Sequence, residues 1–201
     1  MQATKWAKNT SYRQNAGKMV LNEDKIIEGV KKKDSRSQAL LYKQHASFLY
    51  GMALRYTRCG EDAQDVLQEA FIKIFDSIWQ YSKKGSLRAW MMRIVINEAI
   101  FLYRERSKQP TLENFEDYQE IVPDLSAAVS DNFTHDILLG FIQDLSDGYR
   151  TVFNLCEIEG YAQEEVAKML RCNASTLRSQ LSKAKNLLRK KVNEFIENEK
   201  T

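Results

Sequence analysis

A group of side chains near residue 180 is rich in hydrogen-bond donors of the kinds that proteins use to contact DNA. The group consists of Ser175, Thr176, Arg178, Ser179, Gln180 and Lys183. Arginine and glutamine form paired hydrogen bonds with base edges in the major groove, while serine, threonine and lysine also bind phosphate oxygens. The stretch from Arg171 to Lys191 contains no acidic residue, so it would not repel a polyanion. These residues therefore predict a DNA-binding segment.

The surrounding sequence predicts a pair of helices that would present these side chains. A short first helix opens at Gln163, and a second begins near Ala174, after a break at 171–173. Apolar or small residues recur at helical spacing along both: Val166, Ala167, Leu170, Leu177, Leu181, Ala184 and Leu188. This pattern is typical of a helix-turn-helix. Glycine is usual after the first helix, where φ is often positive. Because Arg171 stands there instead, either Asn173 forms the turn or strain costs about 1 kcal/mol.

Charge is distributed in blocks along the chain, although the formal net charge is only +3. The N-terminal segment up to Lys18 carries lysine and arginine but no acid, and the C-terminal helix is again basic. Between them, residues 113–136 contain acidic side chains without any lysine or arginine. This layout predicts two modules that face nucleic acid, joined by an anionic tether.

The sequence gives no support to membrane-spanning, metal-binding or catalytic classes. The longest apolar stretch, near 90–102, is interrupted by Arg93, Asn97 and Glu98, and the N-terminus lacks the apolar segment of a secretory signal. The cysteines and histidines lack metal-ligand spacing. Nucleophile–base pairs and glycine-rich phosphate loops are also missing. We therefore expect a cytoplasmic protein with no membrane insertion, no cofactor and no enzymatic activity.

The hydrophobic periodicity predicts an all-α fold of two small helical domains, a four-helix bundle and a helix-turn-helix domain. Before the helix-turn-helix pair, helices are expected over about 24–33, 35–58, 61–78, 87–106, 136–143 and 147–157. Pro123 falls in the acidic stretch and Pro110 lies just before it, so this part of the chain is expected to separate the domains. The predicted division is a basic extension 1–21, the bundle 22–107, an acidic linker 108–136 and the helix-turn-helix domain 137–195.

Two blocks of sequence point to a known family. The first comprises Asp62–Phe71, Leu87–Trp90 and Ile94–Asn97, and the second comprises Leu145–Phe153 and the helix-turn-helix that follows. Their order and spacing resemble the bacterial sigma-70 superfamily, specifically the extracytoplasmic-function (group 4) sigma factors, which have only domains two and four. The resemblance covers about 22–107 and 137–192 of this chain.

The resemblance implies a promoter-recognition subunit that binds bacterial core RNA polymerase and captures and melts promoter DNA. In this family a polar helix docks on the clamp of the polymerase β′ subunit, and the β subunit is a further partner. The matching residues here are Asp65, Gln68, Glu69 and Asp76. In the family, a loop and the helix after it capture the −10 element. The residues of this chain that match them are Lys83, Lys84, Arg88, Arg93, Asn97, Tyr103 and Arg104. The donor-rich group near residue 180 matches the residues that read the −35 element.

Further expectations follow from individual residues. Gln180 stands where many relatives carry a cation; glutamine pairs with adenine, so the preferred −35 sequence should differ from theirs. Trp90 is expected to pack in the core rather than stack on a base. The acidic linker would either mimic nucleic acid inside the polymerase or act as a disordered tether. The sequence does not decide whether an anti-sigma factor is a further partner.

Two other functions fit parts of the sequence. A stand-alone helix-turn-helix regulator would bind a palindromic site as a dimer, without polymerase. A helical adaptor would use its basic helix to bind an acidic protein. Competition by unrelated DNA and the dependence of binding on salt separate this adaptor from the DNA-binding classes.

Overall fold

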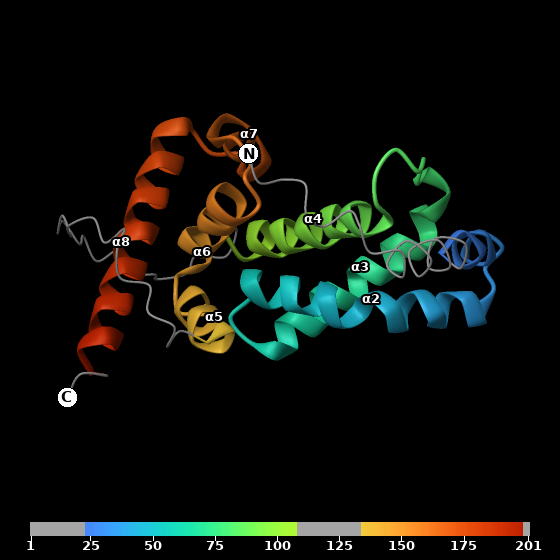
Figure 1. Cartoon of the computed structure of the whole chain (residues 1–201). Coiled ribbons are helices and arrows are strands. Elements are labelled where there is room, and N and C mark those ends of the chain that lie inside the picture. The colour runs from blue at the N-terminus through green and yellow to red at the C-terminus, as the bar shows by residue number, and fades with distance from the viewer. Residues whose placement is uncertain (1–22, 108–133, 199–201) are drawn as a thin grey trace, which may run out of the picture.

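The computed structural model describes residues 23–107 and 134–198, and the elements in these ranges are helical (Figure 1). The N-terminal part contains a helix over 23–31, α2 (Ser35–Tyr56), α3 (Gly60–Ser77), the 3-10 helix η1 (Ile78–Gln80) and α4 (Leu87–Ser107). The C-terminal part contains α5 (His135–Gln143), α6 (Asp147–Phe153), the π-helix η2 (Asn154–Ile158), α7 (Gln163–Leu170) and α8 (Ala174–Asn198). The predicted all-α fold is confirmed. The expected extension 1–21 and most of the expected linker lie outside the described residues.

Side chains that accept hydrogen bonds from backbone amides fix the starts of several helices. The Asp34 carboxylate accepts from the Ser37 amide at 2.9 Å, and aspartate is among the preferred residues at this position. Asn173 caps α8 in the same way, accepting from an amide of the first turn at 2.7 Å. At the other end, α2 stops at Tyr56 because Thr57 takes an extended conformation. The last carbonyl groups of α2 are therefore left without partners in their own helix.

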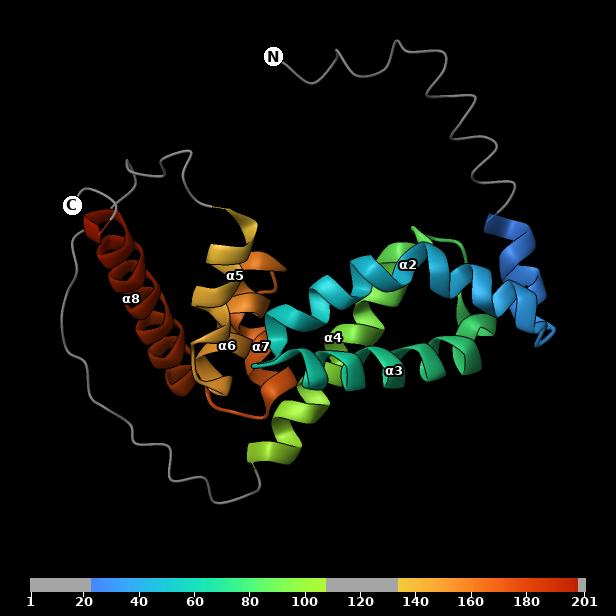
Figure 2. The same cartoon turned by 90° about the horizontal axis from the view of Figure 1, so that it is seen from below.

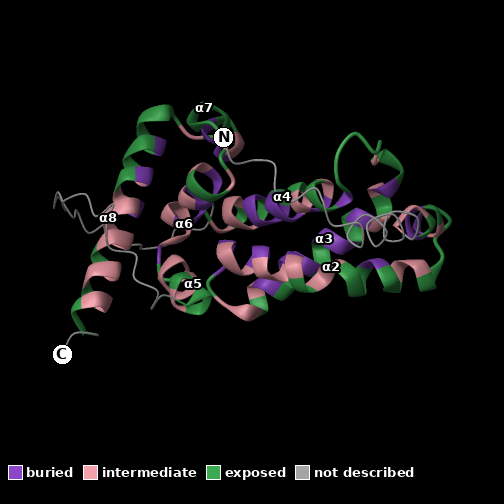
Figure 3. Cartoon of the chain, viewed as in Figure 1, coloured by how far each residue is buried: buried purple, intermediate pink, exposed green. Residues whose placement is uncertain are grey.

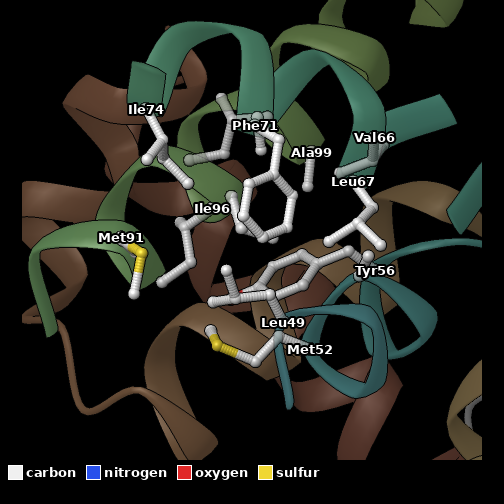
Figure 4. Close-up of a cluster of buried hydrophobic side chains, with 14 of the residues drawn as sticks. Leu49, Met52, Tyr56, Val66, Leu67, Phe71, Ile74, Met91, Ile96 and Ala99 are labelled. Carbon is white, nitrogen blue, oxygen red and sulfur yellow. The ribbon is translucent and has the colours of Figure 1, made fainter. Parts of the chain in front are cut away.

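The N-terminal bundle buries an apolar stripe of α3, the helix expected over 61–78. Its buried members on α3 are Ala63, Val66, Leu67, Ala70, Phe71 and Ile74. Part of this stripe faces side chains from the two neighbouring helices (Figure 4), namely Leu49, Met52 and Tyr56 on α2 and Met91, Ile96 and Ala99 on α4. Removal of these apolar surfaces from water is the main favourable term holding the three helices together. It also fixes which face of α3 remains in solvent.

The two parts of the chain share a hydrophobic core. In both views, α5, α6 and α7 lie between α8 and the N-terminal bundle (Figures 1 and 2). Buried apolar side chains form a continuous cluster that extends from Ile26 in the first helix to Leu181 in α8. The two helical domains are therefore packed together in this conformation, with α6 against α2 and α4.

The helix that starts at Asp147 differs from the expected helix over 147–157. α6 ends at Phe153, and the chain continues as η2, in which the Glu159 amide donates to the Asn154 carbonyl at 2.9 Å. The buried Asn154 side chain donates to the carbonyl of Arg150, one turn earlier, at 2.9 Å. The Arg150 carbonyl also accepts from the Asn154 backbone amide, so it receives two hydrogen bonds from the same residue. Among the described helices, none is long and apolar enough to cross a membrane.

Candidate nucleic-acid interface

α7 and α8 form the predicted helix-turn-helix pair, and their inner faces are buried as expected. The buried residues are Val166, Ala167, Leu170, Leu177, Leu181 and Ala184, while Leu188 is half-buried. The opposite side of the amino end of α8 is exposed (Figure 3). It presents Ser175, Thr176, Arg178 and Ser179. The structure thus brings these −35 candidates together on one accessible surface.

Gln180 and Lys183 are placed differently from the other −35 candidates, because both are half-buried. A β-carbon added to Gly148 on α6 would lie 3.3 Å from Gln180 Nε2 and 3.6 Å from the Tyr103 hydroxyl. The Gln180 amide therefore lies against α6 in this conformation, at the edge of the inner face of α8. It also lies close to a residue of the N-terminal bundle.

The sequence left two alternatives for the turn between α7 and α8, a strained Arg171 or a turn formed by Asn173, and the structure combines them. Arg171 adopts the left-handed conformation, with φ 55° and ψ 39°, and Asn173 caps the following helix. The Cys172 amide closes the turn by donating to the Ala167 carbonyl at 3.1 Å. A side chain with a β-carbon is strained in this region of φ and ψ, so Arg171 carries a local cost.

Replacement of Arg171 by glycine should stabilise the protein, because glycine adopts a positive φ without steric conflict. We expect the free energy of unfolding to rise by about 0.5–1 kcal/mol, less than the full strain, since glycine also gives the unfolded chain more freedom. Urea unfolding would measure the change. Lys168→Gly is the control, because glycine in the interior of α7 should cost about 1 kcal/mol. A loss of stability in Arg171→Gly would contradict a strained turn.

Aromatic contacts hold the loop between η1 and α4, the first part of the −10 candidate surface. The Tyr81 hydroxyl donates to the Gly85 carbonyl at 2.6 Å, and the Tyr81 ring centroid lies 5.8 Å from that of Trp90. Trp90 is half-buried and packs against the core, as expected. Lys83 has a φ of 60° and pairs with Asp24 at 2.7 Å. The loop is therefore positioned by its own residues and by the first helix.

The remaining −10 candidates at the amino end of this surface differ in their present contacts. Lys84, Arg93 and Asn97 are exposed. The guanidinium carbon of Arg88 lies 3.5 Å from the ring centroid of Phe48, a cation–π contact that fixes this side chain on the bundle. Exposed cations and an amide on this loop and the helix that follows it can bind a nucleic-acid backbone and base edges.

The −10 candidates at the carboxyl end of α4 lie at the contact with the C-terminal part. Tyr103 and Arg104 are half-buried. Arg104 donates a hydrogen bond to the main-chain carbonyl of Met169 in α7. The structure therefore separates these two residues from the −10 candidates that face solvent and joins them to the helix-turn-helix.

Phe101 is an exposed aromatic residue that the sequence reasoning left unassigned. Its side chain is 56% exposed, and Lys73 Nζ lies 5.6 Å from the ring centroid. Phe101 follows Arg93 and Asn97 at successive steps of four residues on α4, so the three lie along one side of the helix. This spacing was the signal available in the sequence. Such a ring can stack on an unpaired base.

The polar face of α3 carries the polymerase-binding candidates, and all of them are exposed: Asp65, Gln68, Glu69 and Asp76. Beside them, a groove of about 730 Å³ runs between α2 and α3. Its lining is mainly aromatic and aliphatic and includes Tyr42, Leu67, Phe71, Ile72 and Phe75. This side of the bundle therefore combines carboxylates and amides with an accessible apolar groove.

Asp62, at the start of α3, has a different role from the exposed carboxylates. Its Oδ1 lies 2.6 Å from an Arg106 guanidinium nitrogen, which joins the start of α3 to the end of α4. This hydrogen bond and the charge of Arg106 lower the pKa of the Asp62 carboxyl. Asp62 is therefore ionised at neutral pH and bound within the bundle.

Comparisons with known proteins identify the two parts of the chain. The family model of sigma-70 region 2 matches residues 41–109, and that of sigma-70 region 4 matches residues 135–188. Together the two matches span more than half of the chain. The chain belongs to the sigma-70 family. It is thus a DNA-binding sigma factor of transcription initiation, and the alternative of a stand-alone helix-turn-helix regulator is not favoured.

Relatives of this sigma factor agree with the predicted extracytoplasmic-function group. It is 27% identical over 187 residues to the ECF RNA polymerase sigma-E factor of Escherichia coli (strain K12), covering 88% of the chain and 97% of that protein. It is 26% identical over 184 residues to the RNA polymerase sigma-H factor of Pseudomonas aeruginosa, covering 87% and 95%. Among solved structures, the sigma factor RpoE in complex with the anti-sigma factor NepR from Bartonella quintana has a TM-score of 0.47 and 19% identity, covering 77% and 96%.

Proposed function

We propose that this sigma factor docks on the β′ clamp of core RNA polymerase through the polar face of α3, with the β subunit as a further partner. The observation that carries the proposal is the division of α3 into a buried apolar face and an exposed polar face that contains Asp65, Gln68, Glu69 and Asp76. Carboxylates and amides on a rigid helix suit a basic partner helix, because complementary charge steers the encounter and fixes its register.

The −10 element would be captured as an unpaired strand along the loop 81–86 and α4. Melting without ATP requires that binding of the single strand offset the cost of unstacking its bases. The exposed residues Lys84, Arg93 and Asn97 can contact this strand directly. Phe101, on the same side of α4, would add a stacking surface for one base. Lys83 and Arg88 would exchange their present partners for phosphates.

The −35 element would be read by the amino end of α8 in the major groove. Ser175 and Thr176 stand at the helix start, where hydroxyl groups and the helix dipole favour phosphate. Arg178 and Ser179 are exposed and can reach base edges. Lys183 would contact the backbone, and Gln180 would read a base once its amide leaves Gly148.

Replacement of Gln180 by alanine should relax discrimination at one position of the −35 element. Glutamine binds adenine through two hydrogen bonds, so its removal should cost about 1–3 kcal/mol on the preferred sequence and little on sequences without that adenine. Binding of the holoenzyme to a series of single-base promoter variants would measure the change. Ser182→Ala, on the exposed side of the same turn of α8, is the control. Equal weakening on every variant would argue against base reading by Gln180.

The remaining assignments follow from this function. We propose the division into a basic extension 1–21, region 2 over 22–107, an acidic linker 108–136 and region 4 over 137–195. RNA synthesis itself would be catalysed by the polymerase, and the sigma factor would work in the cytoplasm, where that enzyme meets promoters. An anti-sigma factor is a further proposed partner, supported by the accessible apolar groove between α2 and α3.

Run-off transcription with bacterial core polymerase tests the proposed function. Reactions with and without the sigma factor would be compared on a library of promoter fragments. We expect transcripts that depend on both the sigma factor and particular promoters. Tight binding of the protein alone to a palindromic site, with no core-dependent transcript, would instead assign it to the stand-alone regulators.

A further inference from the structure

Trp79, in the 3-10 helix η1, lies on the surface of the bundle and has no role in the functions described above. Its side chain is 69% exposed, more than any other large apolar side chain in the described part of the chain. The preceding residue, Ile78, is buried, so η1 is fixed to the bundle while Trp79 stays in solvent. Tryptophan is enriched at protein interfaces, because burial of its large ring contributes strongly to binding.

A hydrogen bond holds the exposed indole ring in place. Trp79 Nε1 donates to the main-chain carbonyl of Asp76, three residues earlier, at 3.0 Å. The indole N–H is the only polar group of this side chain, so the rest of the ring presents an apolar surface whose hydrogen bonding is already satisfied. Because the ring is ordered in the free protein, a partner that covers it would lose little conformational entropy at this side chain.

Trp79 continues a regular pattern of exposed residues along α3. Five exposed residues follow one another at alternating steps of four and three: Asp65, Glu69, Ile72, Asp76 and Trp79. Residues at such steps lie along one side of a helix, and helices that pack against each other use the same spacing. The polar face of α3 therefore includes one exposed apolar side chain, Ile72, and is extended by a second, Trp79, at its carboxyl end.

Charge favours a protein rather than a nucleic acid as the partner of Trp79. The ring is bonded to the main chain of Asp76, whose side chain is exposed, and the last turn of α3 contains no lysine or arginine. A carboxylate repels the phosphates of a DNA strand but attracts a basic protein helix. The exposed ring of Phe101 has the opposite setting, because Lys73 Nζ lies 5.6 Å from its centroid. Phe101 thus suits an unpaired base, whereas Trp79 suits a protein.

We infer that Trp79 is an apolar anchor of the contact with core RNA polymerase, so that the docking surface extends past α3 onto η1. The inference rests on the proposed function, because it assumes that the polar face of α3 meets the β′ clamp. The carboxylates of that face steer and align the partner, whereas burial of the Trp79 ring supplies a large part of the affinity.

Hydroxyl-radical footprinting of the unaltered chain tests whether the polymerase covers Trp79. Oxidation of Trp79 would be measured by mass spectrometry in the free sigma factor, in its complex with core polymerase, and in that complex with promoter DNA. We expect most of the oxidation to be lost when core polymerase binds, and no further change when DNA is added. Unchanged oxidation in the complex with core polymerase, or protection that appears only with DNA, would overturn the inference. This measurement needs no variant, so it does not depend on how a variant folds.

Trp79→Ala in the full chain tests whether the covered ring contributes affinity. We expect its affinity for core polymerase to fall about 30-fold, as is typical of a tryptophan near the centre of an interface. Leu138→Ala is the matched control, because it removes an exposed large apolar side chain from α5, outside the polar face of α3. Urea unfolding of both variants would verify that they are folded. Equal affinities of Trp79→Ala and Leu138→Ala would overturn the inference.

Asp65→Arg with Glu69→Arg, measured in the same binding assay, separates this inference from the proposed function. If that double variant loses affinity for core polymerase but Trp79→Ala matches its control, the anchor is refuted and docking through α3 stands. If the unaltered chain neither binds core polymerase nor directs run-off transcription, the proposed function fails, and the inference fails with it.

Discussion

Replacement of Asp65 and Glu69 together by arginine should abolish promoter-dependent transcription by this sigma factor while leaving its fold intact. The two carboxylates are exposed and stand four residues apart on one side of α3. Their reversal turns the proposed docking face from acidic to basic, and like charges across an interface cost several kcal/mol. We expect affinity for core polymerase to fall by at least about 100-fold, which is about 2.7 kcal/mol.

The measurement is binding of the labelled sigma factor to core polymerase, followed by run-off transcription. Glu194→Arg with Glu197→Arg is the control, because it makes the same change of net charge at exposed positions near the carboxyl end of α8. Binding of isolated residues 137–195 to −35 DNA should be unaffected by the α3 changes, since that fragment lacks them. Normal affinity of the double variant for core polymerase would remove α3 from the docking surface.

Replacement of Arg150 by methionine should cause the largest loss of stability of any single change proposed here. The guanidinium is fully buried and donates to the carbonyls of Tyr56, Gln143 and Leu145 and to the Asp147 carboxylate. Burial lowers the pKa of Arg150, an effect that the charge of Asp147 opposes. Methionine fills a similar space but leaves these acceptors without their donor. We expect the free energy of unfolding to fall by about 3–5 kcal/mol.

Urea unfolding would measure this loss, and Arg58→Met provides a matched control. Arg58 binds the same Asp147 carboxylate at 3.1 Å, but its side chain is 52% exposed. Its removal should therefore cost less than about 1 kcal/mol. Equal losses in the two variants would mean that the shared carboxylate, rather than the buried carbonyl groups, accounts for the effect.

The helices and their buried faces could be predicted from the sequence because they depend on local periodicity. The helix expected over 61–78 forms as α3, and Leu177 and Leu181 on α8 are buried as predicted. The sequence also showed that Arg171 occupies a position where glycine is usual. This could be predicted because the requirement for a positive φ concerns a single residue. Whether a residue lies on the buried face of a helix, or at its end, is decided by residues only a few positions away in the sequence.

The contact between the two regions could not be predicted in this way. Arg150 and Asn154 are polar residues in a helix that periodicity alone would place toward solvent or an ordinary polar edge. Their acceptors, the carbonyls of Tyr56 and Arg55, are more than ninety residues earlier in the chain. The π-helix that accompanies Asn154 was missed for the same reason. Only the packing of α6 on the end of α2 makes these side chains buried and bonded.

At the carboxyl end of α2, the carbonyls of Leu54, Arg55 and Tyr56 accept hydrogen bonds from three side chains of region 4, and the two sides of this contact constrain the sequence unequally. The acceptors on α2 are main-chain carbonyls, which every residue type supplies, whereas the donors on region 4 are the particular side chains of Gln143, Arg150 and Asn154. Residues 54–56 can therefore change during evolution without loss of these bonds, provided that the helix still ends there. A region 4 transplanted from another sigma factor would keep these hydrogen bonds to α2 only if it carried equivalent donors.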